Sequence, residues 1–215
     1  MIESATGIIL RTRPLTETSL IVHWLTPELG RIATVAKGAR RPKSPFAGKL
    51  DLFYAADFSF SRSRRSDLHT LREVKLLETH GAIREDIVKL QQAGYAAAFL
   101  ESATETETPL PEIFGLTCGF LKHLCGQTPR PQDIFALELK LLRELGLEPD
   151  FDETRLTPGA KRILHTLLES DWAAGARLKL SPAQAAELRQ YLHGFLIFHL
   201  GRLPRGRPAA LAEAD

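Results

Sequence analysis

The sequence predicts an α+β protein in two parts, a small closed β-barrel followed by an all-α helical domain. Up to about residue 79, apolar side chains alternate with polar ones or form short runs bounded by turns, and after Gly81 they recur every three or four positions. With 215 residues, of which 44% are hydrophobic and 25% charged, the chain can bury a core in each part. We expect the barrel over residues 1–80 and the helical domain over residues 81–215.

Five strands are expected in the first part, over residues 7–13, 20–25, 31–36, 52–60 and 68–77. Pro14 ends the first strand, and a turn containing Pro27 and Gly30 joins the second to the third. The fourth is the clearest, since its apolar residues share one parity and so bury one face. Five strands with no strong helix to cover an open sheet favour a closed barrel. The five-stranded OB-fold is the commonest such barrel, and an SH3-like barrel is the alternative.

Five helices are expected in the second part, over residues 84–104, 113–125, 131–145, 157–169 and 181–200. Gly146 is a typical C-terminal signal for the third. Thr157 and Ser181 are expected to cap the last two, because each precedes a proline suited to the first turn. The only two cysteines, Cys118 and Cys125, would lie about two turns apart on one helix, too far for a disulfide. We expect both to be buried and structural.

No run of 18 apolar residues occurs, and the first residues lack the basic-then-apolar order of a secretory signal. We therefore expect a cytoplasmic protein with no membrane partner.

The charge is unevenly distributed along the chain. Residues 1–80 hold 13 Lys and Arg against 8 Asp and Glu, a net of +5, whereas residues 81–200 hold 12 against 16, a net of −4. Such asymmetry favours binding of a polyanion by the first part.

The most informative stretch covers residues 29–50. It contains no acidic residue and carries six cations, namely Arg31, Lys37, Arg40, Arg41, Lys43 and Lys49. Interspersed glycines and prolines exclude a regular element, so we expect an irregular loop that presents these cations to a nucleic-acid backbone. The alternative is a solvated loop that covers a barrel edge, although such a loop normally mixes both signs.

A second cationic cluster, Arg62, Arg64 and Arg65, falls in the expected turn between the last two strands, where OB-folds close their loops over nucleic acid. Strand residues, including Arg11 and Arg13, could extend the same surface. Phe46, inside the basic stretch, could stack on a base.

No catalytic constellation can be assembled from the sequence. The Gly48-Lys49-Leu50 run is not a nucleotide-binding P-loop, because Leu50 replaces the Ser or Thr that would hold magnesium. The seven histidines match no metal-motif spacing, and no nucleophile elbow is present. Three glutamates, Glu105, Glu107 and Glu112, fit a polar connector between helices. We expect neither an enzyme nor a bound metal or cofactor.

The chain resembles the RecO family of bacterial recombination mediators. The resemblance rests on residues 7–10, 13, 17–20, 25–26 and 30–31, and above all on the run Val35-Ala36-Lys37-Gly38-Ala39-Arg40. It continues through residues 137–142 and 145–150 to His199-Leu200-Gly201-Arg202, and so covers most of the chain.

The resemblance implies an OB-fold that binds single- and double-stranded DNA without sequence preference, joined to a helical domain. It implies strand annealing, cooperation with RecR, and recognition of the acidic C-terminal tail of single-stranded DNA-binding protein, so that RecA is loaded during gap repair. By position it carries over a DNA-facing set of Arg13, Arg31, Lys37, Arg40 and Arg41.

The sequence departs from the family at one place. Many members carry a four-cysteine zinc ribbon after the Leu-Gly-x-x-Pro stretch, whereas here residues 152–155 run directly into residues 156–159, none of them cysteine. We therefore predict that the ribbon is deleted and that no metal is bound. For the acidic tail, the candidate positions are Lys122, Lys140 and Arg143 on the helices.

Two other functions stay open from the sequence. One is a protein-interaction adaptor with a purely structural barrel, and the other is an RNA-binding factor that uses the same cationic loop.

Overall fold

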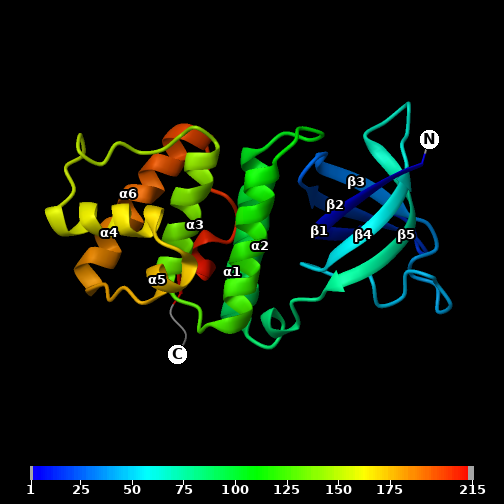
Figure 1. Ribbon diagram of the computed structural model, residues 1–215, viewed down its shortest axis with the longest axis horizontal. Coiled ribbons are helices and arrows are strands. Elements are labelled where there is room, and N and C mark those ends of the chain that lie inside the picture. The colour runs from blue at the N-terminus through cyan, green and yellow to red at the C-terminus, as the bar shows by residue number, and fades with distance from the viewer. Residues whose placement is uncertain (1, 213–215) are drawn as a thin grey trace. The chain divides into compact units, whose positions relative to one another are not determined.

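The alternating apolar residues of the first eighty positions form five strands: β1 (Ile2–Pro14), β2 (Leu20–Thr26), β3 (Gly30–Ala36), β4 (Ala55–Ser61) and β5 (Leu68–Glu78). In the computed structural model, which describes residues 2–212, the strands close in the order β1-β2-β3-β5-β4, and β4 pairs back onto β1 (Figure 1). This OB-like ring confirms the predicted fold class. Its narrowest seam is the parallel pairing of β3 with β5, which spans only Ala33 to Val35.

The barrel interior is filled by the inward residues of every strand. Trp24 stacks on Phe58 with ring centroids 4.0 Å apart, and its indole N–H donates to the Thr34 hydroxyl at 2.9 Å. Phe46 belongs to the same core and is only 7% exposed, although it comes from the segment between β3 and β4. The prediction that Phe46 stacks on a base is therefore wrong, because its ring is one of the side chains that fill the barrel.

The compact unit that contains the barrel also includes residues 104–115, which comprise the connection between two helices and the first residues of the second helix. We call residues 104–110 the strap. The strap follows the start of β3: Thr106 forms a bridge with Arg31, and the Glu107 N–H donates to the Arg31 carbonyl at 3.0 Å. The Leu110 N–H donates to the Pro27 carbonyl at 2.9 Å. The strap thus extends the hydrogen bonding of β3 beyond the short β3–β5 seam.

The second unit consists of residues 82–103 and 116–215 and is helical where it is described. The five expected helices are α1 (Ile87–Ala103), α2 (Pro111–Gly126), α3 (Pro131–Glu144), α4 (Pro158–Glu169) and α6 (Pro182–Leu200). The hydroxyls of Thr157 and Ser181 accept from the backbone N–H groups of Ala160 and Gln184, which confirms both predicted caps. Three short elements were not expected, namely η1 (Gly81–Ile83), α5 (Trp172–Ala176) and α7 (Arg207–Ala210).

Cys118 and Cys125 are both half-buried, rather than fully buried as expected. Within residues 2–212, no three His, Cys, Asp or Glu side chains gather closely enough to hold a metal ion. The residues present therefore do not fit the family's zinc ribbon. None of the helices in the described part of the chain has the length and apolar character needed to cross a bilayer.

Candidate nucleic-acid interface

The segment between β3 and β4, residues 37–54, is the basic loop. It is folded as successive turns: the N–H groups of Arg41, Ser44 and Ala47 each donate to the carbonyl three residues earlier at 3.1 Å. Gly38 and Gly48 take φ angles of +70° and +71°, which a residue with a Cβ adopts at a cost. The Phe46 side chain inserts into the barrel core from this loop. The loop is therefore a fixed platform for its cations, whereas Arg31, which the sequence grouped with them, lies in β3.

Four cations of the basic loop are exposed, namely Lys37, Arg40, Arg41 and Lys43, and Lys49 is half-buried. Among residues 2–212, none of these five side chains forms an ion pair with a carboxylate. The backbone N–H of Arg40 donates to the Thr18 carbonyl at 3.0 Å, which fastens the loop to the turn between β1 and β2. Their positive charges are thus directed to solvent from a rigid support.

Three arginines of the strands surround His23. Arg11 on β1 lies directly opposite His23 on β2, and Arg13 follows two positions later. Burial, together with the charges of Arg11, Arg13 and Arg31, lowers the pKa of His23 to about 4. His23 is therefore neutral at neutral pH, and its environment is electropositive. Arg31 itself is engaged with the strap, since its Nε donates to the Thr104 hydroxyl at 2.7 Å.

The turn between β4 and β5, residues 62–67, is the arginine hairpin. Arg64 and Arg65 are exposed at its tip. Arg62 differs from them because its guanidinium pairs with Glu3 at 2.8 Å and with Glu107 at 3.2 Å. Of the three arginines that the sequence groups as one cluster, only Arg64 and Arg65 at the tip lack a carboxylate partner among residues 2–212.

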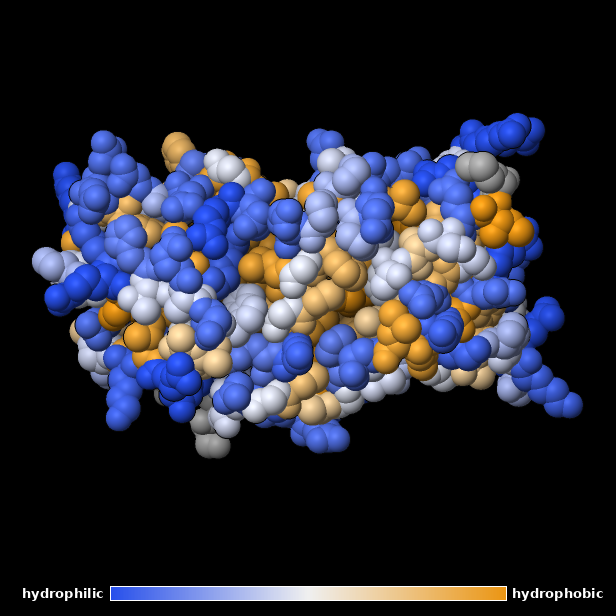
Figure 2. Space-filling view, in the orientation of Figure 1, coloured by the Kyte–Doolittle hydropathy of each residue, from blue (hydrophilic) through white to orange (hydrophobic). Residues whose placement is uncertain are grey.

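The basic loop and the arginine hairpin lie at different ends of the barrel. Ser61, at the base of the hairpin, pairs with Ile2 at the start of β1, whereas the loop contacts the turn that follows the end of β1. The two segments leave the barrel at separate places in Figure 1, and hydrophilic side chains project from this part of the molecule in Figure 2. A ligand that touches both the basic loop and the arginine hairpin must therefore extend along the barrel.

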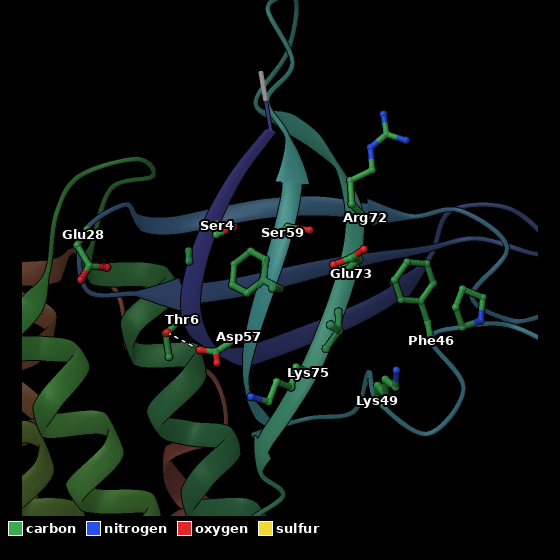
Figure 3. Close-up of a pocket in the computed structure, with 14 residues that line it drawn as sticks. Ser4, Thr6, Glu28, Phe46, Lys49, Asp57, Ser59, Arg72, Glu73 and Lys75 are labelled. Carbon is green, nitrogen blue, oxygen red and sulfur yellow. Dashed lines mark hydrogen bonds between the residues drawn. The ribbon is translucent and has the colours of Figure 1, made fainter.

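A pocket of about 680 Å³ opens on the barrel beside β1, β4 and β5 (Figure 3). Its charged lining has both signs, since Lys49, Arg72 and Lys75 are matched by Glu28, Asp57 and Glu73. Asp57 also accepts a hydrogen bond from the Thr6 hydroxyl at 2.7 Å. Because the carboxylates offset the cations, this pocket does not favour phosphate.

The three positions suggested for an acidic partner differ in their surroundings. Lys122 is exposed on α2. Lys140 is only 7% exposed, and its ammonium donates to the Leu168 and Ser170 carbonyls at 2.6 and 2.8 Å. Arg143 pairs with Glu169 at 3.1 Å. Lys140 thus binds the C-terminal end of α4, and its charge faces the helical unit itself.

A groove of about 550 Å³ in the helical unit combines apolar walls with cations. We call it the proline groove; its lining includes Pro129, Pro131, Leu178, Leu180, Arg130 and Lys179. Arg130 and Lys179 are both exposed. The sequence does not indicate this site, because its two walls lie about fifty residues apart and neither carries a motif.

Comparison with known proteins identifies the family. Residues 1–80 match the family model described as recombination protein O N terminal, and residues 84–157 match recombination protein O C terminal. The DNA repair protein RecO of Anaeromyxobacter sp. (strain K) is 30% identical over 92% of this chain and 91% of its own length. The chain belongs to the RecO family.

RecO proteins of two other bacteria are similar to the same extent. That of Bacillus pumilus is 30% identical over 94% of this chain and 81% of its own length, and that of Listeria monocytogenes serotype 4a is 33% identical over 94% and 80%. The family predicted from the basic run and the helix signatures is therefore confirmed over nearly the whole chain.

Proposed function

We propose that this RecO-family chain binds single- and double-stranded DNA through its backbone, without sequence preference and without catalysis, in DNA repair. The relatives that it matches are named as DNA repair proteins. The single observation that carries the proposal is the basic loop, whose Lys37, Arg40, Arg41 and Lys43 are exposed and unpaired with carboxylates within residues 2–212. Rigidly held cations replace the counterions of phosphates, and this contribution is the same for every base sequence.

Backbone binding also supports a role in strand annealing. A protein that holds phosphates leaves the base edges unoccupied, so two bound complementary strands remain able to pair. We propose that the chain anneals complementary strands and, together with RecR, mediates the loading of RecA during recombinational gap repair. The candidate DNA contacts are Arg11, Arg13, Lys37, Arg40, Arg41, Lys43, Lys49, Arg64 and Arg65, with Arg31 beside them.

Reversing two charges of the basic loop should weaken DNA binding strongly. If the five loop cations each meet a phosphate of single-stranded DNA, log K should fall with log salt at a slope of about −3.5. Arg40→Glu with Arg41→Glu should make that slope shallower by about 1.4, and should reduce affinity at 0.1 M salt by roughly 25-fold or more. Fluorescence anisotropy of labelled oligonucleotides at several salt concentrations measures both quantities.

The matched control is Arg155→Glu with Arg162→Glu, which makes the same charge change at two exposed positions of the helical unit. It should retain affinity within about twofold, because it leaves every cation of the basic loop in place and salt screens charges that do not contact DNA. A control as weak as the loop variant would show that net charge, and not the loop, determines binding. Stronger competition by RNA than by DNA of the same length would favour the RNA-binding alternative.

We further propose that the proline groove receives the acidic C-terminal tail of single-stranded DNA-binding protein. Its Arg130 and Lys179 suit carboxylates, and its prolines and leucines suit apolar side chains of a peptide. Arg130→Glu with Lys179→Glu should weaken binding of the tail peptide by roughly tenfold or more, because like charges then meet across the contact. Lys122→Glu with Arg143→Glu is the matched control. If only the control substitutions weaken binding, the tail binds instead to the surfaces of α2 and α3 that carry Lys122 and Arg143.

A further inference from the structure

Arg62 stands apart from the other cations of the arginine hairpin because carboxylates already hold it. Its Nε and Nη2 donate to the two oxygens of Glu3 at 2.8 and 3.0 Å, and its Nη1 donates to Glu107 at 3.2 Å. These hydrogen bonds raise the pKa of Arg62 and lower that of Glu3. Three of the five N–H donors of the guanidinium are therefore directed to carboxylates of β1 and the strap.

Glu107 connects the two ends of the hairpin. Its second oxygen lies 3.0 Å from Nε2 of His69, a buried side chain near the start of β5. The other ring nitrogen, Nδ1, accepts from the Ser63 N–H at 3.4 Å. His69 also stacks on Phe60, with centroids 5.2 Å apart. The Glu107 carboxylate thus links Arg62, the first residue of the hairpin, to His69 in β5, the strand that follows the hairpin.

The strap gives Glu107 a fixed position. The Glu107 N–H donates to the Arg31 carbonyl of β3 at 3.0 Å, next to the bridge between Arg31 and Thr106. The tip of the hairpin is also held by a hydrogen bond, since the Arg65 N–H donates to the Ser63 hydroxyl at 3.2 Å. Beyond these contacts only Arg64 and Arg65 are left to meet a ligand with their charges.

We propose that Arg62 is a positioning residue: with Glu3 and Glu107 it holds the arginine hairpin so that Arg64 and Arg65 reach DNA phosphates, and it does not contact DNA itself. The inference rests on the proposed DNA binding and adds how one of its surfaces is fixed. It also predicts that Glu107, a residue of the strap between α1 and α2, increases DNA affinity, although its negative charge alone would decrease it.

The two roles of Arg62 predict opposite signs. If Arg62 were a phosphate contact, removing the Glu107 carboxylate would take away one of its two carboxylate partners and reduce the repulsion of DNA, and DNA would bind more tightly. If Arg62 is a positioning residue, the same removal releases the hairpin, and DNA binds less tightly although the protein has become more positive.

Glu107→Ala in the full-length chain is the decisive variant, with labelled single-stranded oligonucleotide as the probe. The loss of each phosphate contact weakens binding roughly fivefold at 0.1 M salt, so we expect weakening of about fivefold or more. The salt slope should become shallower, although no cation has been removed. Glu107→Gln, which keeps the side-chain volume, should act in the same direction. Glu17→Ala removes an exposed carboxylate from another turn of the barrel and should leave affinity unchanged or slightly increased.

A double-mutant cycle separates positioning from a general loss of structure. In a chain that already carries Arg64→Ala and Arg65→Ala, Glu107→Ala should have no further weakening effect. Arg62→Lys should behave like Glu107→Ala, because an ammonium keeps the charge but loses the bidentate geometry toward Glu3.

Unchanged or tighter binding by Glu107→Ala overturns the positioning role while leaving the proposed function intact. Equal weakening in the Arg64→Ala, Arg65→Ala background also overturns it, because the effect would then not pass through the tip of the hairpin. Absence of salt-dependent DNA binding by the unsubstituted chain overturns the proposed function, and this inference with it.

Discussion

Arg207→Met should destabilise the protein by about 3–5 kcal/mol, the range typical of breaking one partner out of a buried ion pair. Arg207 begins α7 and is 3% exposed. Its Nε and Nη2 donate to the two carboxylate oxygens of Glu138 at 2.6 and 2.9 Å, and Glu138 on α3 is fully buried. Methionine fills much of the volume of arginine but offers no donor, so the carboxylate would be left inside the helical unit without its counter-charge.

The surrounding hydrogen bonds make the pair a junction of several elements. The Tyr95 hydroxyl of α1 donates to Glu138 at 2.5 Å, and the Gln92 amide donates to the Ala210 carbonyl at 3.1 Å. Burial, together with the Glu138 charge, raises the pKa of Tyr95 well above its usual value. Tyr95 therefore stays a neutral donor and cannot replace the charge of Arg207. Loss of Arg207 should loosen the last helix from α1 and α3 together.

Chemical denaturation monitored by tryptophan fluorescence measures the change in unfolding free energy. Arg205→Met, at an exposed position two residues earlier, is the matched control and should lie within about 0.5 kcal/mol of the unsubstituted chain. Glu138→Met combined with Arg207→Met should recover much of the loss, because an apolar pair needs no counter-charge. A double variant as unstable as Arg207→Met alone would show that the helix requires the guanidinium for its hydrogen bonds rather than for charge balance.

Local periodicity explains why the order of elements could be predicted. Apolar alternation in β4 and hydroxyl caps at Thr157 and Ser181 are encoded within a few neighbouring residues. The short helices α5 and α7 have too few turns to produce a periodic pattern. α7 also depends on Arg207 reaching Glu138, 69 residues away, a contact that no local pattern reports.

The candidate site was predictable in composition but not in detail. The acid-free basic stretch contains the four exposed loop cations, Lys37, Arg40, Arg41 and Lys43, but nothing local separated Arg62 from Arg64 and Arg65. The difference arises from Glu3 and Glu107, which lie 59 and 45 residues from Arg62. Likewise, the strap was expected to be only a polar connector, because its hydrogen bonds to β3 need no apolar pattern.

Lys140 illustrates a further limit of sequence reasoning. A lysine on an amphipathic helix is usually solvated, yet here desolvation lowers its pKa and the ammonium binds the last carbonyls of α4. Cations at helix C-termini interact favourably with the free carbonyls. The cation can come from a different helix, as Lys140 of α3 does at the end of α4. Its role depends on tertiary packing that the sequence pattern does not contain.

Phe46→Ala should affect both stability and DNA binding, because this ring joins the basic loop to the barrel. Phe46 is 7% exposed among core residues of the barrel, and its ring points from the loop toward the strands (Figure 3). Truncating a buried phenylalanine costs about 3–5 kcal/mol; we expect about 3 here, because the ring also borders two open pockets. The loop would then keep its turns and its charges but lose the ring that anchors its middle part in the barrel core.

The loss of the anchor should be visible in binding even where the variant is folded. Cations on a loosened loop must be ordered again when they meet DNA, so affinity should fall although no charge has changed. Urea denaturation measures the change in the free energy of unfolding. Anisotropy of labelled oligonucleotides, at a temperature well below the unfolding transition, separately measures the DNA affinity of the folded chain. Phe198→Ala, the same substitution at a side chain that is 82% exposed, should change neither. A Phe46→Ala chain that is destabilised but binds DNA with unchanged affinity and salt slope would show that the turns and glycines of the loop suffice to hold its cations in place.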